Sequence, residues 1–266
     1  PYEVASELSY FIWGTMPDQE LLAAAKAKQL STKDAIVKQA KRMLASDKAP
    51  HAVKHFAKQW LGVDRVLVTA KDPNEYATLT PTMRSAMLEE TQRFVSHVLL
   101  DGSGTLKELF NAKYSFVNEE LATHYGLDAE VSDWEKVSFT NDEREGILTQ
   151  GSVLTTWALP GGSSPIHRGL FVRQKLLCQP LPMPPPAVNV QPPPVLESQT
   201  TRERFKIHLT EQVCSSCHNL IDPIGFVFEH YDGIGAYRAD ENGKKIDDSG
   251  EIQTTSATNG PIEGVI

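Results

Sequence analysis

Apolar residues recur every three or four positions through most of the first 124 residues, which is the spacing of an amphipathic helix. Tyr2, Ala5 and Leu8 begin one such stripe. Thr80 followed by Pro81 is a helix start, because threonine caps the first turn and proline fits within it. Residues 31 and 34 resemble a capping box, with Ser31 as the cap. The pattern predicts helices over residues 1–13, 15–30, 31–44, 48–61, 80–100, 105–110 and 118–124.

The pattern loosens after Gly126. Residues 151–157, 164–177 and 200–213 keep helical character, and the last of these helices is expected to run directly into Cys214. Residues 239–252 contain Asn242-Gly243 between polar, strand-like arms, which is typical of a tight hairpin turn. We therefore predict a mainly α fold with little strand outside this short β-hairpin.

A proline-rich connector separates two of the later helices, at residues 179–194. Eight of the fifteen residues from 180 to 194 are proline. Such a run cannot form a helix or a central strand and favours an extended conformation. It is expected to be a stiff segment on the surface, and a docking site for a proline-binding module is the less favoured alternative.

Composition and charge narrow the possible partners. The chain has 40% hydrophobic and 23% charged residues, as expected of a globular protein, and a formal net charge of −8. The phosphates of a nucleic acid would be repelled by that charge, so we expect no nucleic-acid partner. No run approaches the length of about 20 apolar residues that a membrane span needs, so we expect none in this chain.

The run Cys214-Ser215-Ser216-Cys217-His218 carries the clearest chemical signal. Two thiols three positions apart can add to the two vinyl groups of a haem, and the next imidazole can bind the iron, so the spacing predicts c-type haem attachment. Zinc would need two further ligands, and the remaining cysteine, Cys178, lies across the proline segment. A redox dithiol usually follows a strand, whereas a helix is predicted here. We expect one covalent haem c.

The predicted haem attachment implies a cellular compartment and leaves one cysteine, Cys178, without a role. Covalent haem attachment takes place outside the bacterial cytoplasm, so a periplasmic or extracellular location is expected. Cys178 is then an odd thiol, expected to be a buried small hydrophobe or to pair with a cysteine outside this sequence. The chain opens within an amphipathic helix and stops in a glycine-rich stretch, and we expect both ends to be cuts within a longer protein.

His218 is the expected proximal iron ligand, and the sixth ligand remains open. His167, within a polar cluster of a predicted helix, is the first candidate, followed by Met183, His230 and His208; a vacant position or a ligand from missing sequence is also consistent. Arg168 and Arg238 are candidates for binding the haem propionates, since a guanidinium matches a carboxylate. Surface solvation is the alternative for each arginine.

Several longer segments of the chain form recognisable motifs: residues 8–18, 56–62, 114–119, 146–151, 164–169, 222–226 and 229–235. On these segments the chain resembles the uncharacterised domains associated with planctomycete-type cytochrome c, found in long secreted multidomain bacterial proteins with further cytochrome-like and carbohydrate-binding modules. The resemblance covers nearly the whole chain and implies a helical domain at residues 1–128 and a haem-bearing domain at 129–266.

Two functions from different classes follow from these observations. The first is single-electron transfer by a cytochrome c-like unit to a redox partner protein or domain. The second is a haem oxidoreductase with an open iron position, acting on peroxide, oxygen or a polysaccharide-linked substrate. No nucleophile elbow, phosphate loop or H-E-x-x-H motif is present, and Lys244 and Lys245 exclude a calcium loop at residues 240–251. A third alternative makes the helical half an interaction platform and the haem structural. Electron transfer is preferred because no acid–base constellation is evident.

Overall fold

The structure is a computed structural model and describes residues 1–128, 130–186, 191–196, 198–254 and 259–266. The α-helices are α1 (Tyr2–Trp13), α2 (Gln19–Lys26), α3 (Lys33–Leu44), α4 (Ala49–Leu61), α5 (Pro81–Leu100), α6 (Leu106–Asn111), α7 (Glu119–His124), α8 (Gly151–Thr156), α9 (Pro165–Phe171), α10 (Thr201–Thr210), α11 (Gln212–His218) and α12 (Asp222–Phe226). Two 3-10 helices, η1 (Val63–Leu67) and η2 (Ile147–Thr149), and a π-helix, η3 (Val172–Leu176), complete the helical elements. The predicted mainly α fold is confirmed.

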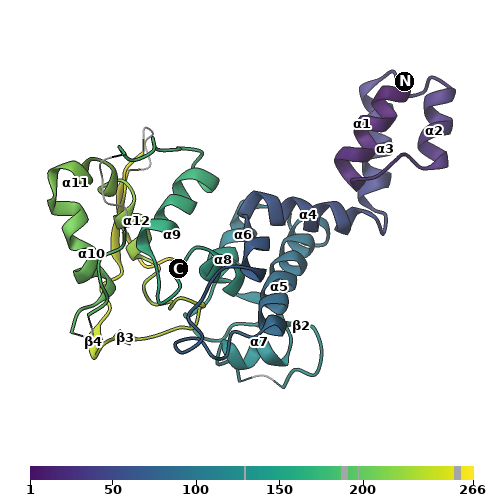
Figure 1. Cartoon of the computed structure of the whole chain (residues 1–266). Helices are drawn as coiled ribbons and strands as arrows, with labels where there is room; N and C mark the ends of the chain where they lie inside the picture. Colours follow the sequence, from purple (N-terminus) through teal and green to yellow (C-terminus); the bar gives the residue numbers. More distant parts are fainter. Residues whose placement is uncertain (129, 187–190, 197, 255–258) are drawn as a thin grey trace.

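The first three helices form a small unit with its own core. Buried side chains from all three meet there, and the indole of Trp13 donates a 2.9 Å hydrogen bond to the carbonyl of Met43. Figure 1 shows this unit at one end of the molecule, joined to the rest through α4. Three predicted boundaries in this unit were wrong. Helix α2 starts after Asp18, which caps it, and ends at Lys26 and not at Leu30. Thr32 rather than Ser31 caps α3, since its side chain accepts a hydrogen bond from the Ala35 amide.

A larger hydrophobic core joins residues from both sides of position 128. Phe94 of α5, Leu154 of α8 and Phe171 of α9 are buried in one cluster with Phe228. The indole of Trp60 on α4 also donates a hydrogen bond of 3.2 Å to the carbonyl of Lys175. Position 128 therefore does not separate two independent cores.

Among the described residues, three small antiparallel sheets accompany the helices. Strands β1 (Tyr114–Val117) and β2 (Glu135–Ser138) pair, as do β3 (Asp240–Glu241) with β4 (Lys244–Lys245), and β5 (Ser249–Ile252) with β6 (Gly260–Glu263). The predicted turn is present, with Asn242 and Gly243 at φ 53° and 73° between β3 and β4. The predicted hairpin is shorter than expected, because β5 pairs with β6 instead. The pairing of β1 with β2 was not predicted.

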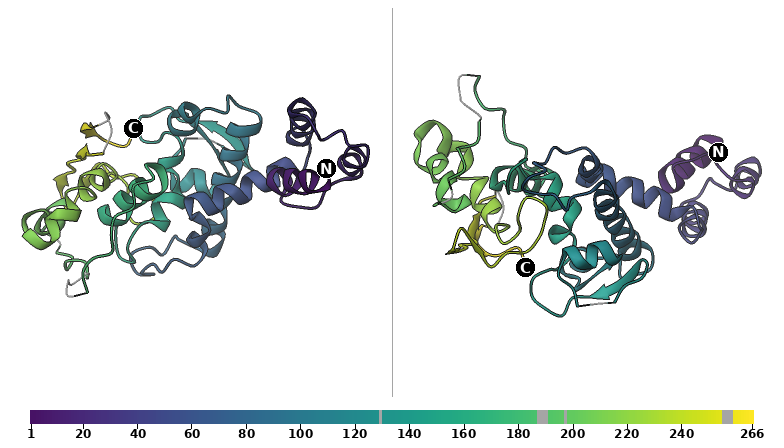
Figure 2. Two further views of the ribbon diagram at one scale, coloured as in Figure 1. Left: turned by 90° about the horizontal axis from the view of Figure 1, so that it is seen from above. Right: turned by 60° about the horizontal axis from the view of Figure 1, so that its bottom comes forward.

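Short helices lie before and after the connector in the second half of the chain. The single helix predicted over 200–213 is interrupted at Glu211, whose ψ of 120° separates α10 from α11. Figure 2 shows α10 and α11, coloured green, at the end of the molecule away from α1–α3. Residues 179–186 and 191–194 of the connector contain no helix or strand, as predicted, and residues 187–190 lie outside the described residues.

Helices α9 and α12 pack so closely that their backbones are in contact. A Cβ on Gly225 would lie 1.8 Å from the carbonyl oxygen of Pro165, and one on Gly169 would lie 2.2 Å from that of Ile221. Only glycine permits such an approach at either position. The two contacts hold the segment after the Cys-x-x-Cys-His run against α9.

Candidate haem-binding site

A cavity of about 310 Å³ lies between α9, the proline segment, α10 and α11. Its volume is within the range of ligand-binding pockets. Cys214, Cys217 and His218 line one part of it, and apolar side chains such as Leu170 and Phe205 line another. The tertiary structure thus brings the Cys-x-x-Cys-His run to a partly open, largely apolar cavity.

The motif itself forms the short helix α11. Both thiols are free and partly exposed, and they face the cavity together with the His218 ring. Three positions on a helix correspond to nearly one turn, so the thiols lie on the same side of α11. This arrangement fits the residue types and spacing that covalent haem attachment requires.

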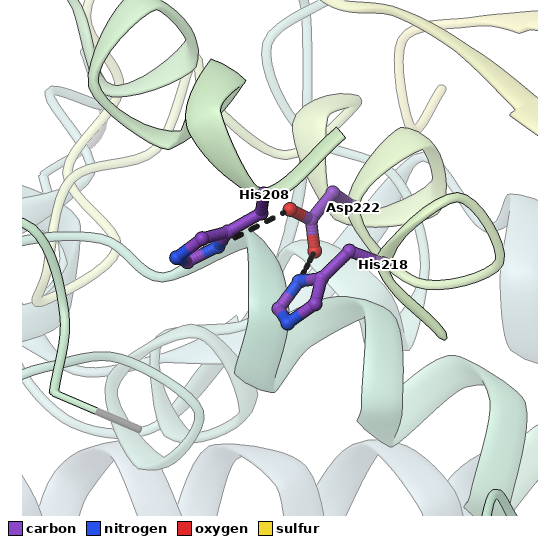
Figure 3. A group of neighbouring side chains, drawn as sticks. All are labelled: His208, His218 and Asp222. Carbon is purple, nitrogen blue, oxygen red and sulfur yellow. Dashed lines mark hydrogen bonds and ion pairs between the residues drawn. The ribbon is translucent and has the colours of Figure 1, made fainter. Parts of the chain in front are cut away.

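His218 is held by a buried carboxylate. Asp222, at the first turn of α12, is 0% exposed, and its Oδ1 accepts a hydrogen bond of 2.9 Å from Nδ1 of His218. Figure 3 shows the two side chains facing one another, with Nε2 of His218 pointing away from Asp222. The ring nitrogen left free is therefore the one that can bind a metal.

His208 of α10 approaches the same carboxylate. Its Nδ1 lies 3.7 Å from Oδ2 of Asp222, and its ring centroid lies 4.3 Å from that of His218 (Figure 3). The three side chains offer ligand atoms that all lie within 4.8 Å of one another, so they could also hold a metal ion. Asp222 was missed as a site residue and His208 was ranked last. The i, i+4 spacing of His218 and Asp222 is a sequence signal that could have found the first.

Of the other candidate sixth ligands, two line the cavity and one does not. His167, whose amide is capped by Ser164, and Met183, whose side chain is 88% exposed, both line the cavity. His230 does not line it: its ring stacks on Tyr237 at 5.3 Å, and its Nδ1 lies 2.8 Å from the carbonyl oxygen of Arg238. His167 and Met183 are thus brought together with the motif, and His230 is not.

Neither arginine proposed for the propionates lines the cavity. Arg168 is 1% exposed and donates to the carbonyls of Phe228 at 3.0 Å and Tyr231 at 2.7 Å, as well as to those of Leu154 and Asp232. Arg238 forms ion pairs of 3.0 Å with Glu229 and with Glu241. Both guanidinium groups therefore bind the protein's own carbonyls and carboxylates.

Cys178 differs from its expected environment. Its thiol is free and the residue is exposed, and its backbone has a φ of 54° just after η3. The prediction of a buried small hydrophobe was wrong, because the chain turns outward there at the start of the proline segment. Pairing with a cysteine outside this sequence stays a prediction.

A second buried carboxyl lies in the body of the protein, away from the cavity. Glu90 on α5 accepts hydrogen bonds from Ser115 at 2.7 Å and from the Tyr125 hydroxyl at 2.5 Å. Its burial raises the pKa of the carboxyl to about 7. The guanidinium of Arg144 lies 3.7 Å from the centre of the Tyr125 ring. This network joins α5 to the segment that leads into α8.

The fold and this site define a mainly α protein with a Cys-x-x-Cys-His run at a partly open cavity. Residues 1–127 match a family described as a protein of unknown function (DUF1592), named PSD4, and residues 144–241 match another described as a protein of unknown function (DUF1588), named PSCyt3. The chain thus matches two families of uncharacterised domains in tandem, in agreement with the resemblance to uncharacterised multidomain proteins. No curated protein and no solved structure matches the chain. Within the described residues, no helix is both long and apolar enough to span a membrane.

Proposed function

We propose that this chain binds one haem c covalently through Cys214 and Cys217, with His218 as an iron ligand, and serves in single-electron transfer outside the cytoplasm. The observation that carries the proposal is the convergence of both thiols and the imidazole on one cavity. The name PSCyt3 of the second family, whose match contains the motif, refers to a cytochrome and supports the same conclusion.

The bound haem would supply an iron that alternates between two oxidation states by one electron. The residues of this chain would anchor and orient it and limit the access of water. The thiols would hold it to α11, and His218 would present Nε2 to the cavity. Leu170 and Phe205 would provide apolar walls. A protein or domain that accepts or delivers the electron is the implied partner.

Electron transfer is preferred to catalysis because three candidate ligand side chains besides His218 line the same cavity. They are His167, Met183 and His208, and one of them could supply the second iron ligand. A six-coordinate iron favours electron transfer, whereas an open position favours ligand chemistry.

The test is to produce the chain with a c-type maturation system and stain a denaturing gel for haem. Haem should remain on the denatured wild-type band and should be lost from a Cys214→Ala/Cys217→Ala variant. Cys178→Ala is the matched control, because this exposed thiol does not line the cavity, and it should keep the haem. Absence of haem from the wild-type band would refute the proposal, and zinc bound to the protein would then be assayed.

The spectrum separates electron transfer from the oxidoreductase alternative. Reduced protein whose absorption bands do not change under carbon monoxide has both axial positions filled, as electron transfer requires. A large shift under carbon monoxide would instead place an open or weakly held position at the iron and favour the enzyme.

A further inference from the structure

The carboxylate of Asp222 is buried beside the Cys-x-x-Cys-His run. It is 0% exposed, and within the described residues its ion-pair partners inside 4.0 Å are the imidazoles of His218 and His208, with no lysine or arginine among them. A buried carboxylate without a lysine or arginine partner is costly unless its hydrogen bonds compensate. Its position beside His218 therefore calls for a reason beyond packing.

The position of Asp222 is held by the fold. Helix α12 starts at this residue, four positions after His218, and the glycine contacts with α9 lie on both sides of the carboxylate in the sequence. Because those contacts join backbone to backbone, the backbone of Asp222 cannot move relative to α9 without separating α9 from α12. This fixed backbone holds the carboxylate near His218, to which it makes the 2.9 Å bond.

We infer that Asp222 is a positioning residue that fixes the orientation and tautomer of His218 and makes it a stronger donor to the iron. This inference rests on the proposed haem function. A carboxylate that accepts a hydrogen bond from Nδ1–H leaves the lone pair of Nε2 facing the cavity and increases the electron density of the ring. A more electron-rich ligand stabilises ferric iron over ferrous iron, so Asp222 lowers the reduction potential.

His208 is the second imidazole that lies next to the Asp222 carboxylate. Within the described residues, Nδ1 of His208 and Oδ2 of Asp222 are both buried without a hydrogen-bond partner, although they lie only 3.7 Å apart. A small movement would join them, so that one carboxylate accepts from both rings (Figure 3). His208 is on this account a second contact of Asp222.

The experiment compares the reduction potentials of haem-loaded wild type and Asp222→Asn at fixed pH. The substitution keeps the shape and removes the charge. It should shift the ferric-to-ferrous equilibrium at least tenfold toward ferrous iron, a rise of about 59 mV for one electron. Glu211→Gln is the matched control, since it removes an exposed charge three residues before Cys214 without contacting His218. It should shift the potential by much less.

The outcomes separate the inference from the proposed function. Haem on the denatured wild-type band with an equal potential in Asp222→Asn would overturn the positioning role and leave haem binding intact. A shift as large in Glu211→Gln would also overturn it, because the effect would then be one of net charge. If Asp222→Asn fails to fold, Asp222→Ser supplies the same comparison with a smaller neutral side chain. Absence of haem from wild type would refute the function itself.

Discussion

Gly225 of α12 approaches Pro165 of α9 so closely that a Cβ on the glycine would lie 1.8 Å from the proline carbonyl oxygen. The reciprocal contact of Gly169 with Ile221 places the same two helices together at their other end. Helix α12 carries Asp222 and α9 carries His167, so the geometry of the cavity wall depends on these contacts.

Gly225→Ala should therefore destabilise the protein. The added methyl meets backbone that cannot yield without separating α9 from α12, and overpacking of this kind costs about 3 kcal/mol. The higher helix propensity of alanine returns only about 1 kcal/mol. Urea unfolding of both proteins measures the difference. Gly161→Ala is the control, because its Cβ would have no atom within 4 Å, and it should change the free energy of unfolding by less than about 1 kcal/mol.

Arg168→Lys should lower stability although it keeps the charge. The guanidinium donates to carbonyls of residues 228–232 and to that of Leu154. A single ammonium cannot make all of these bonds, which leaves buried carbonyls without donors. We expect a loss of about 3 kcal/mol in urea unfolding. Arg65→Lys, at an exposed position, should change stability by no more than about 0.5 kcal/mol. Equal stabilities of Arg168→Lys and wild type would contradict this structural role.

Glu90 should make the stability of the protein depend on pH. Its pKa is raised from 4.5 to about 7 in the folded state by burial, so the folded protein holds this proton more tightly than the unfolded chain. The stabilisation is complete below about pH 4.5 and is lost as the pH rises to about 7, a total of about 3 kcal/mol. Glu90→Gln keeps the shape without the titration. The unfolding free energy of wild type minus that of Glu90→Gln should decrease as the pH rises across this interval. A difference that stays constant with pH would refute the assignment.

His167→Ala should open a coordination position on the iron. His167 is carried by a helix fixed to α12, whereas Met183 is carried by the proline segment, and ligands on regular elements are held more accurately. The reduced variant should shift its absorption bands under carbon monoxide, and Met183→Ala, as the comparison, should not. The opposite result would assign the sixth position to Met183.

Much of the local structure follows from the sequence alone. Thr80 and Pro81 start α5, and the predicted end at Leu100 is also observed. The Asn242-Gly243 turn occurs where it was expected. The spacing of Cys214, Cys217 and His218 is sufficient to predict haem attachment. These features depend on residues within a few positions of one another, so capping, turn geometry and ligand spacing are sufficient to specify them.

Only the tertiary structure decided which distant groups meet. The break at Glu211, the pairing of β5 with β6 and the sharing of one core across position 128 each depend on packing between segments far apart in the chain. Arg168 was expected to reach a ligand and instead binds buried carbonyls contributed by other segments. Spacing along one helix cannot reveal such partners, because the energy that selects them is gained only when the segments are packed together.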